Sequence, residues 1–408
     1  MGFQHGLSGL NAASNNLDII GHNIANSNTV GFKSSRGEFA EMVAASVAGA
    51  SAGTSGIGVN LVDVAQQFSQ GTINSTNNSL DVAINGNGFF VVNSPAGIAY
   101  TRAGNFQLDR QGNLITATGD NVMGYTVDPV TGERNSVELS ELAFPVGQPI
   151  PAKQTTAVTA TLNLDARAGL AAGDPLATPP VAATPRATYG TSLQVYDSLG
   201  VAHDVSLYFE KTGTNEWTVY DSLDSTATAL GTATFDTTGK LTAMTPSPLA
   251  LNITTSSGAT TPLTPSVDLS GLTQFGSSFS VSKLSQDGYA SGELTGVTVA
   301  GDGKVLATYS NGITRAEGQL AMAKFTNTQG LAPAGNNNWV VTQDSGPAIY
   351  GTAGDGNYGV LQGSALEESN VDITAELVNM MTAQRAYQAN AQTIKTQDQV
   401  FSSLVNLR

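Results

Sequence analysis

The sequence contains no cysteine and only three histidines, and these shortages remove most of the common site chemistries. Without cysteine there are no disulfides, thiolate metal sites or cysteine nucleophiles. His5 and His22 lie near the N-terminus and His203 lies far from both, so no Ser-His-Asp triad or multi-histidine metal site is visible. We therefore predict a protein that is not an enzyme, with no catalytic residues, no metal and no cofactor. His203, between Val201 and Val205, is interpreted as a packed or partly exposed strand residue.

Charge is also scarce. Charged residues make up 12% of the chain, and 17 Lys and Arg against 32 Asp and Glu give a formal net charge of −15. This balance argues against nucleic acid or an anionic membrane as a partner. No apolar run reaches about 18 residues, and the start lacks the basic and apolar regions of a secretory signal, so neither membrane insertion nor a cleaved signal peptide is expected. A surface of neutral polar residues suits a molecule surrounded by copies of itself.

Apolar residues recur at intervals of seven near both ends of the chain, which predicts two amphipathic terminal helices. The N-terminal series, with one offset position, is Phe3, Leu7, Leu10, Leu17 and Ile24. The C-terminal series, with one offset position, is Leu366, Ile373, Leu377, Met380, Tyr387, Ile394 and Phe401. We call these residues the seam.

The expected helices run from Phe3 to about Asn26 and from about Val371 to Leu407. Ser369 stands three residues before Asp372, in the spacing of a capping box. The second helix would be on the order of 55 Å long, which is more than one compact domain usually covers. Two interpretations follow: the helices pair within one molecule, or the seam packs against helices of other copies. Polar and small interruptions of the seam favour the second interpretation; they are Ser14, Gly21, Gln384 and Asp398.

The middle of the chain has the alternation and turn residues of β-structure. A hairpin is predicted around Asn85-Gly86, between Leu80 and Val92. Further turns are predicted at 109–113, 197–200, 236–239 and 301–304. The stretch from Glu38 to Ala52 is rich in Ala and Ser and could be helical or loose. Residues 166–187 have the composition of a linker, with Pro175, Pro179, Pro180 and Pro185.

These features predict a mainly β protein with terminal α-helices, in which one β domain is interrupted by another and both are bracketed by coiled-coil-like helices. The composition shifts toward Thr, Ser, Ala and Pro between about Pro145 and Ser285, which marks the inserted unit. The predicted division is 1–30 and 364–408 for the axial helices of an inner core, 31–74 for a connecting segment, 75–145 and 286–363 for a β-rich middle domain, and 146–285 for an inserted β-rich outer domain.

Motifs at both ends and in the body of the chain resemble those of the bacterial flagellar rod and hook axial proteins. The N-terminal motifs are residues 17–26 and Thr29-Val30-Gly31-Phe32-Lys33. The C-terminal motifs are Leu366-Glu367-Glu368-Ser369-Asn370-Val371-Asp372, Glu376-Leu377-Val378 and residues 384–390. The motifs of the body are residues 80–92, 100–106 and 286–289. The resemblance covers nearly the whole chain.

Within that family, the length and the large insertion point to a hook subunit rather than a rod subunit. The resemblance implies a structural protein that self-assembles into a curved flexible tube, a universal joint that transmits motor torque from rod to filament. It implies four kinds of partner: other copies of the chain, the flagellar rod, the hook cap and hook-filament junction proteins, and the flagellar type III export apparatus. The implied location is the flagellar basal body and hook, outside the cell after export.

Two alternatives are kept. The first is another axial protein, such as a distal-rod-like subunit with an enlarged outer domain. The second, from another class, is a secreted β-rich adhesin or hydrolase, which predicts an active monomer with dispensable termini. For the hook subunit, Ile394→Asp on the seam is expected to block assembly without unfolding the monomer.

Overall fold

The computed structural model describes residues 2–43, 56–129, 131–174, 181–184, 188–224, 227–255 and 258–405. The chain divides into two compact units. Unit 1 comprises Met1–Val146, Gly296–Thr308 and Thr314–Arg408, and unit 2 comprises Gly147–Thr295 and Tyr309–Ile313. Strands dominate both units and one long helix stands near each terminus, so the predicted fold class is confirmed.

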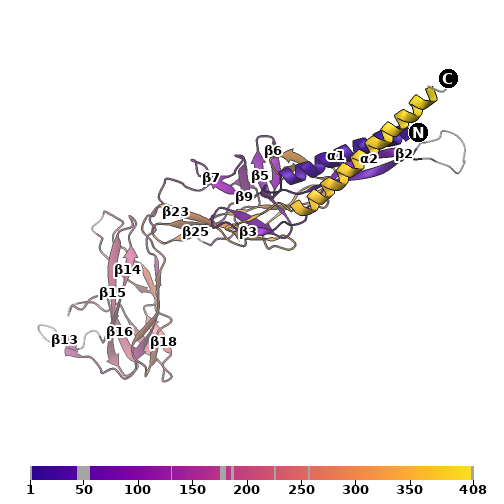
Figure 1. Cartoon of the computed structure of the whole chain (residues 1–408). Coiled ribbons are helices and arrows are strands. Elements are labelled where there is room, and N and C mark those ends of the chain that lie inside the picture. Colours follow the sequence, from indigo (N-terminus) through magenta and orange to yellow (C-terminus); the bar gives the residue numbers. More distant parts are fainter. Residues whose placement is uncertain are drawn as a thin grey trace. The chain divides into compact units, whose positions relative to one another are not determined.

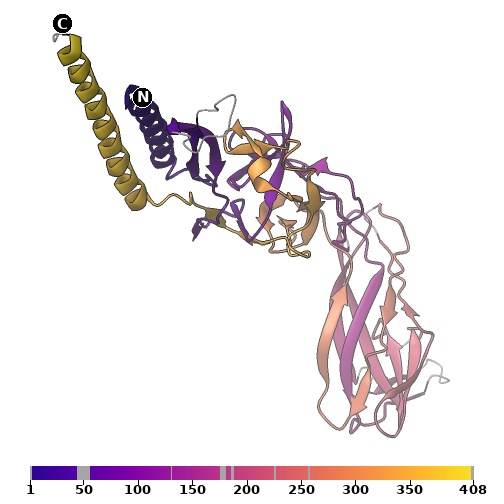
Figure 2. The same cartoon turned by 90° about the vertical axis from the view of Figure 1, so that its right-hand side faces the viewer.

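The two helices are α1 (Gly2–Ala25) and α2 (Ile373–Val405). Figures 1 and 2 show them side by side, with the N- and C-termini at the same end of the pair. The predicted helices agree with this placement to within about two residues at their described ends, because the seven-residue period is a strong helical signal. No helix among the described residues is long and apolar enough to cross a membrane.

The predicted capping box at Ser369 is wrong, because α2 begins three residues later than that box requires. Asp372 is the cap: its carboxylate accepts hydrogen bonds from the backbone N–H groups of Thr374 (2.9 Å) and Ala375 (3.2 Å). Ser369 instead accepts from the N–H of Val371 at 3.3 Å, in the turn before the helix.

An antiparallel pair of strands, β1 (Ser35–Val43) and β2 (Gly56–Gln66), lies along α1 (Figure 1). The first part of the stretch expected to be helical or loose is therefore a strand, and residues 44–52 lie outside the described residues. The described part, residues 38–43, includes Phe39 and Val43, which suit a strand, and it pairs with β2. The pair is held to α1 by a hydrogen bond of 2.6 Å between His5 Nε2 and the carbonyl of Gly56.

Unit 1 is built on a thirteen-stranded sheet, whose main path is β23-β24-β25-β9-β5-β6-β28-β27. These strands are β23 (Leu294–Val299), β24 (Lys304–Tyr309), β25 (Thr314–Leu320), β9 (Asn121–Tyr125), β5 (Phe89–Ser94), β6 (Gly97–Thr101), β28 (Asn338–Val340) and β27 (Ala332–Gly335). The strands off this path are β7 (Phe106–Leu108), β8 (Leu114–Thr116), β10 (Ser140–Glu141), β26 (Met322–Lys324) and β29 (Ile349–Gly351). A short 3-10 helix, η1 (Thr328–Gly330), precedes β27. The predicted turns at 109–113 and 301–304 are confirmed, because they join β7 to β8 and β23 to β24.

Two smaller sheets join sequence-distant parts of unit 1. The strands β3 (Ile73–Ser75) and β31 (Ala365–Glu367) form one, and β4 (Val82–Asn85) and β30 (Val360–Gly363) form the other. The predicted hairpin around Asn85-Gly86 is therefore wrong, since β4 pairs with β30 and not with β5. Positive φ at Gly86 (115°) and Gly88 (127°) turns the chain from one sheet into the other.

Unit 2 contains two five-stranded sheets, whose buried side chains form one core that includes Leu162, Leu207 and Trp217. The first sheet is β14 (Tyr189–Tyr196), β15 (Ala202–Gly213), β16 (Glu216–Tyr220), β17 (Gly231–Phe235) and β18 (Leu241–Thr245). The second is β11 (Ala157–Asp165), β19 (Leu249–Ala250), β20 (Ser266–Asp268), β21 (Thr273–Phe275) and β22 (Ser280–Gln286). The predicted turns at 197–200 and 236–239 are confirmed by the antiparallel pairs β14–β15 and β17–β18.

The stretch expected to be a linker, residues 166–187, contains a short antiparallel pair, β12 (Ala172–Asp174) and β13 (Val181–Thr184). The linker prediction is wrong for these strands, because backbone pairing overrides composition there. The prolines that suggested a linker lie outside the described residues.

Candidate functional site: the helix pair and the buried joint

In the contact between α1 and α2, small and polar residues of α1 meet Ile394, Asn390 and Glu376 of α2. A Cβ on Gly6 would lie 3.0 Å from Cγ1 of Ile394, and a Cβ on Gly9 would lie within 3.0 Å of the side chain of Asn390. At the other end of the pair, Asn23 donates to Oε1 of Glu376 at 3.1 Å. Low residue numbers on α1 meet high numbers on α2, so the helices are antiparallel. Glycines at these positions let the two backbones approach closely.

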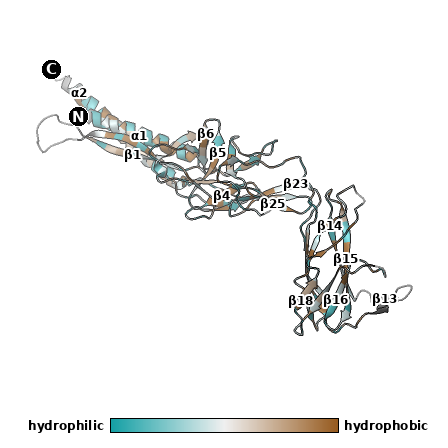
Figure 3. Ribbon diagram, turned by 180° about the vertical axis from the view of Figure 1, so that it is seen from behind, coloured by the Kyte–Doolittle hydropathy of each residue, from teal (hydrophilic) through white to brown (hydrophobic). Residues whose placement is uncertain are grey.

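Apart from Ile394, which lies in this contact, several seam residues are exposed beside it. Leu7 is 44% exposed, and on α2 Leu377 is 47% and Tyr387 is 38% exposed. Ile373 is also exposed, whereas the remaining described seam residues of the two helices are half-buried; they are Leu10, Leu17, Ile24, Met380 and Ile394. The side chains of Phe3 and Phe401 lie outside the described part of the chain. In Figure 3 hydrophobic and hydrophilic residues alternate along both helices.

Two seam residues have a different place from the one predicted. Leu366 belongs to strand β31 and pairs with Asn74, so it is not part of a helix. A seven-residue interval counts as a helical face only where the chain is helical, and here α2 starts at Ile373. Ile394 contacts Gly6 of the same chain, so Ile394→Asp would also disturb the helix pair.

The exposed seam residues of the two helices face the same side of the pair. Leu7, Leu10 and Ile24 each follow a contact residue of α1 by one position, and Leu377 follows Glu376 of α2 in the same way. One position is a rotation of about 100° in the same sense on each helix. Because the helices are antiparallel, these rotations bring both stripes to one side of the pair and form an apolar face, which Ser14, Gly21 and Gln384 interrupt.

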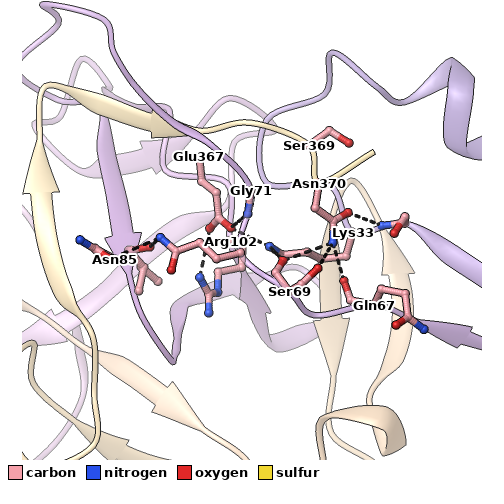
Figure 4. A network of polar contacts seen from close by, with 12 residues as sticks. Lys33, Gln67, Ser69, Gly71, Asn85, Arg102, Glu367, Ser369 and Asn370 are labelled. Carbon is pink, nitrogen blue, oxygen red and sulfur yellow. Dashed lines mark hydrogen bonds and ion pairs between the residues drawn. The ribbon is translucent and has the colours of Figure 1, made fainter. Parts of the chain in front are cut away.

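A second feature lies where both helices join the β-strands of unit 1. Glu367 of β31 is buried, and its two carboxylate oxygens accept from Lys33 Nζ at 2.6 Å and from a terminal nitrogen of Arg102 at 3.0 Å (Figure 4). The N–H of Gly71 donates to Oε1 of Glu367 at 2.9 Å. The side chains of Lys33, Arg102 and Glu367 are at most 5% exposed. We call Lys33, Gly71, Arg102, Glu367 and Asn370 the joint.

The cations of the joint have further partners. Lys33 Nζ donates to the carbonyl of Ser69 at 2.7 Å, and Arg102 donates to the carbonyl of Gly86 at 2.8 Å. Burial lowers the pKa of Lys33 and of Arg102, and the negative charge of Glu367 opposes that shift in both. Nε of Arg102 is buried with no hydrogen-bond partner among the described residues. The joint therefore holds two cations and one anion away from water.

Asn370 extends the joint to the neighbouring backbone (Figure 4). Its Oδ1 accepts from the N–H of Ser34 at 2.8 Å, and its Nδ2 donates to the carbonyl of Gln67 at 2.7 Å. The N–H of Gly31 also donates to the backbone carbonyl of Glu367 at 2.8 Å. The C-terminal segment is thus bound to the chain on both sides of the β1–β2 pair.

Sequence reasoning noted the motifs that contain Lys33, Arg102 and Glu367 but missed that they meet. Lys33 and Arg102 each stand among mainly neutral residues, and a lone charge of that kind was the available signal, whereas Glu367 is followed by Glu368 and carries no such signal. Among the described residues no group of three or more His, Cys, Asp and Glu side chains is arranged to hold a metal ion. His203 lies in β15, with Nε2 3.0 Å from Oδ2 of the buried Asp197.

Four family profiles match the chain, and all describe flagellar proteins. They are Flagella basal body rod protein (residues 3–33), Flagellar hook protein FlgE/F/G D1 domain (83–158), Flagellar basal body protein FlaE D2 domain (163–289) and Flagellar basal body rod FlgEFG protein C-terminal (362–407). Together these profiles span most of the chain.

Curated relatives align along the full chain. The flagellar hook protein FlgE of Escherichia coli strain K12 is 43% identical over 423 aligned residues that cover 100% of both chains. That of Salmonella typhimurium strain LT2 is 42% identical, again with 100% of both chains covered. That of Treponema pallidum is 32% identical and covers 99% of this chain and 98% of its own. The crystal structure of Helicobacter pylori flagellar hook protein FlgE2 shares the fold, with a TM-score of 0.53, 16% identity and coverage of 72% of this chain and 100% of its own.

Proposed function

The chain belongs to the flagellar hook protein family and is a structural subunit of the bacterial flagellar hook rather than an enzyme, and from this premise we propose that its copies assemble through the seam of their terminal helices. The family supports homopolymer assembly within the flagellar basal body and hook. A distal-rod-like subunit is not favoured, because hook proteins match over the full length.

The observation that carries this proposal is the apolar face on one side of the helix pair. Leu7, Leu377 and Tyr387 leave between 38% and 47% of their surface exposed, although each is large and apolar. Val378 and Met381 add further exposed apolar surface on α2. Fully burying one such side chain stabilises a contact by about 1.5–3 kcal/mol. Each of these side chains is already partly buried, so covering it contributes only a part of that value. The contributions of all the exposed side chains add together at each new subunit.

The contact between α1 and α2 leaves the exposed seam residues uncovered, so they are available to other copies of the chain. The close contact between α1 and α2 uses Gly6, Gly9 and Asn23, which contribute little apolar area. A heterologous contact that repeats from copy to copy without closing produces a helical filament. We assign the seam to such a contact in a curved, flexible tube that acts as a universal joint between rod and filament.

The parts of the chain then take the roles expected from the family. Residues 1–30 and 364–408 form the inner core, and 31–74 connect it to the wall. Residues 75–145 and 286–363 form the wall, and 146–285 form the outer layer. We propose that the partners of the chain are other copies, the rod, the hook cap and the hook-filament junction proteins, with export by the flagellar type III apparatus.

The test is Leu377→Asp. Leu377 is exposed in the single chain, so the variant should fold, whereas a buried unpaired carboxylate costs several kcal/mol at each intersubunit contact. Expected are subunits in the medium, no hooks on the cell, and an unchanged thermal transition. Thr396→Asp is the matched control, since it makes the same charge change at an exposed site about 100° round the helix. Normal hooks from Leu377→Asp would refute the seam as the contact.

A further inference from the structure

Three motifs that are far apart in the sequence meet at the joint. Lys33 ends the motif Thr29–Lys33, Arg102 lies in the motif 100–106, and Glu367 lies in the motif 366–372. We propose that Glu367 is the positioning residue that couples the terminal helix pair to the β-strands of unit 1, so that load on the helices passes to the strands. The proposal rests on the proposed assembly for the existence of that load, but its geometry is independent of the seam.

The covalent connections to the helices both pass through the joint. The segment after α1 is held by the N–H of Gly31 on the carbonyl of Glu367 and by the N–H of Ser34 on Asn370. The segment before α2 contains Glu367 and Asn370 themselves, and Ile73 of β3 pairs with Glu367. Releasing the carboxylate of Glu367 would therefore leave the backbone bond of Gly31 and the side chain of Asn370 to hold these segments.

Charge makes Glu367 the essential member of the joint. With Lys33 and Arg102 positive and Glu367 negative, the buried cluster carries one net positive charge. Neutralising Glu367 leaves two buried cations without a counter-charge, which is strongly unfavourable. Neutralising Lys33 instead leaves one Arg102–Glu367 pair with balanced charge. The substitutions at the two ends of one ion pair should thus have unequal effects.

The packing of the joint leaves no room for the segments to slide. Gly31 has φ of +68°, and a Cβ there would lie 2.6 Å from the backbone N of Ala103 and C of Arg102. A Cβ on Gly71 would collide with the carbonyl oxygen of Glu368. The absence of side chains at these two glycines lets three backbone segments approach around one carboxylate.

Amide hydrogen exchange on the full-length monomer tests the coupling. In Glu367→Gln, protection of residues 31–37 and 67–72 should fall by at least about 100-fold, the lower end of the factor that corresponds to an unpaired buried charge. Protection of β5 and β9 should be unchanged. Lys33→Met should cause a change of only a few fold, and Glu367→Gln combined with Lys33→Met should recover part of the lost protection.

The control is Glu368→Gln, which makes the same change at the next residue, whose side chain is exposed and bonds to Asn74. Equal effects of Glu367→Gln, Lys33→Met and Glu368→Gln would overturn the proposal, as would a double variant no better protected than Glu367→Gln. Glu367→Gln alone could fail to fold, and the double variant with Lys33→Met then decides. Folding of the double variant with restored protection would support the coupling role of Glu367. Failure of the double variant to fold would overturn that role.

Hook assembly distinguishes the proposed coupling role of Glu367 from the proposed role of the seam as the contact between subunits. Glu367→Gln keeps every seam residue, so hooks should still form, with lower torsional stiffness than hooks of Glu368→Gln under the same imaging. Unchanged stiffness would overturn the coupling role. Normal hooks from Leu377→Asp would instead remove the proposed seam and leave the exchange result standing.

Discussion

Among single residues, aspartate forms the same hydrogen-bonding arrangement in several turns of this protein. In three hairpins one carboxylate oxygen accepts from the backbone N–H groups two and four residues further on, at distances of 2.7–3.0 Å; the residues are Asp109, Asp197 and Asp236. The residue three positions on is in each case a glycine with φ of 83–89°, namely Gly112, Gly200 and Gly239. Burial opposes ionisation of Asp109, but the side chain and backbone N–H of Asn113 outweigh it and lower the pKa; the Thr238 hydroxyl and the backbone N–H groups of Lys240 and Thr238 lower the pKa of Asp236. Such turns need no contact from elsewhere in the fold.

Asp287 provides a pH-dependent prediction. Burial opposes its ionisation, but the backbone N–H groups of Ala157 and Thr156, the Thr156 hydroxyl and Lys153 outweigh burial and lower its pKa from 3.8 to about 2. A pKa lowered in the folded state contributes stability above pH 3.8, and this contribution is lost as the pH falls toward 2. We expect Asp287→Asn to reduce the free energy of unfolding of unit 2 by about 1 kcal/mol at pH 7.

The measurement is chemical unfolding of the full chain, with Trp339→Phe in every variant so that fluorescence reports Trp217 alone, between pH 2 and pH 5. The wild-type chain should lose stability across this range more steeply than Asp287→Asn. Asp204→Asn, at an exposed site in the same unit, should follow the wild-type slope. Identical slopes for the wild type and Asp287→Asn would show that this carboxylate does not contribute.

At the scale of the element, the start of α2 is decided by one side chain. Asp372 accepts from two N–H groups of the first turn, and its negative charge lies at the positive end of the helix dipole. Ser369, which has the sequence spacing of a cap, does not reach those groups.

We therefore expect Asp372→Ala to destabilise the first turns of α2 by about 1 kcal/mol and Ser369→Ala to leave them nearly unchanged. Amide exchange at residues 374–380 measures both variants in the monomer. A larger loss of protection from Ser369→Ala than from Asp372→Ala would contradict the assignment of the cap.

At the scale of the whole molecule, each unit has its own core with one of the two tryptophans. Trp217 is fully buried in unit 2 and donates to Oε1 of Gln274 at 2.9 Å. Trp339 is 3% exposed in unit 1 and packs edge to face on Phe68 and Phe89. Separate cores predict separate cooperative transitions.

The expected result is that Trp217→Phe and Trp339→Phe, each leaving one tryptophan, report different denaturant midpoints by fluorescence. Calorimetry of the wild-type chain should resolve two transitions for the same reason. One shared midpoint in both single-tryptophan variants and in calorimetry would show that the two units unfold together. That result would contradict the prediction of separate transitions.

Local pattern was enough for part of this structure. The seven-residue period predicted α1 and α2, and Asp-x-x-Gly spacing predicted the turns at 197–200 and 236–239, because each signal lies within a few residues of the feature it specifies. The neighbouring glycines of α1 were equally visible, but nothing local distinguishes Gly6 from Leu7 as the residue that meets α2.

Only the tertiary structure decided which distant segments meet. The pairing of β4 with β30, the contact of Gly6 with Ile394 and the ion pairs of Glu367 with Lys33 and Arg102 each join residues more than two hundred positions apart. The free energy of such a pairing depends on the closure of long loops and on burial summed over the whole unit. No short stretch of sequence determines these contributions to the free energy. The motifs could therefore be recognised one by one, but the joint that they form could not be predicted.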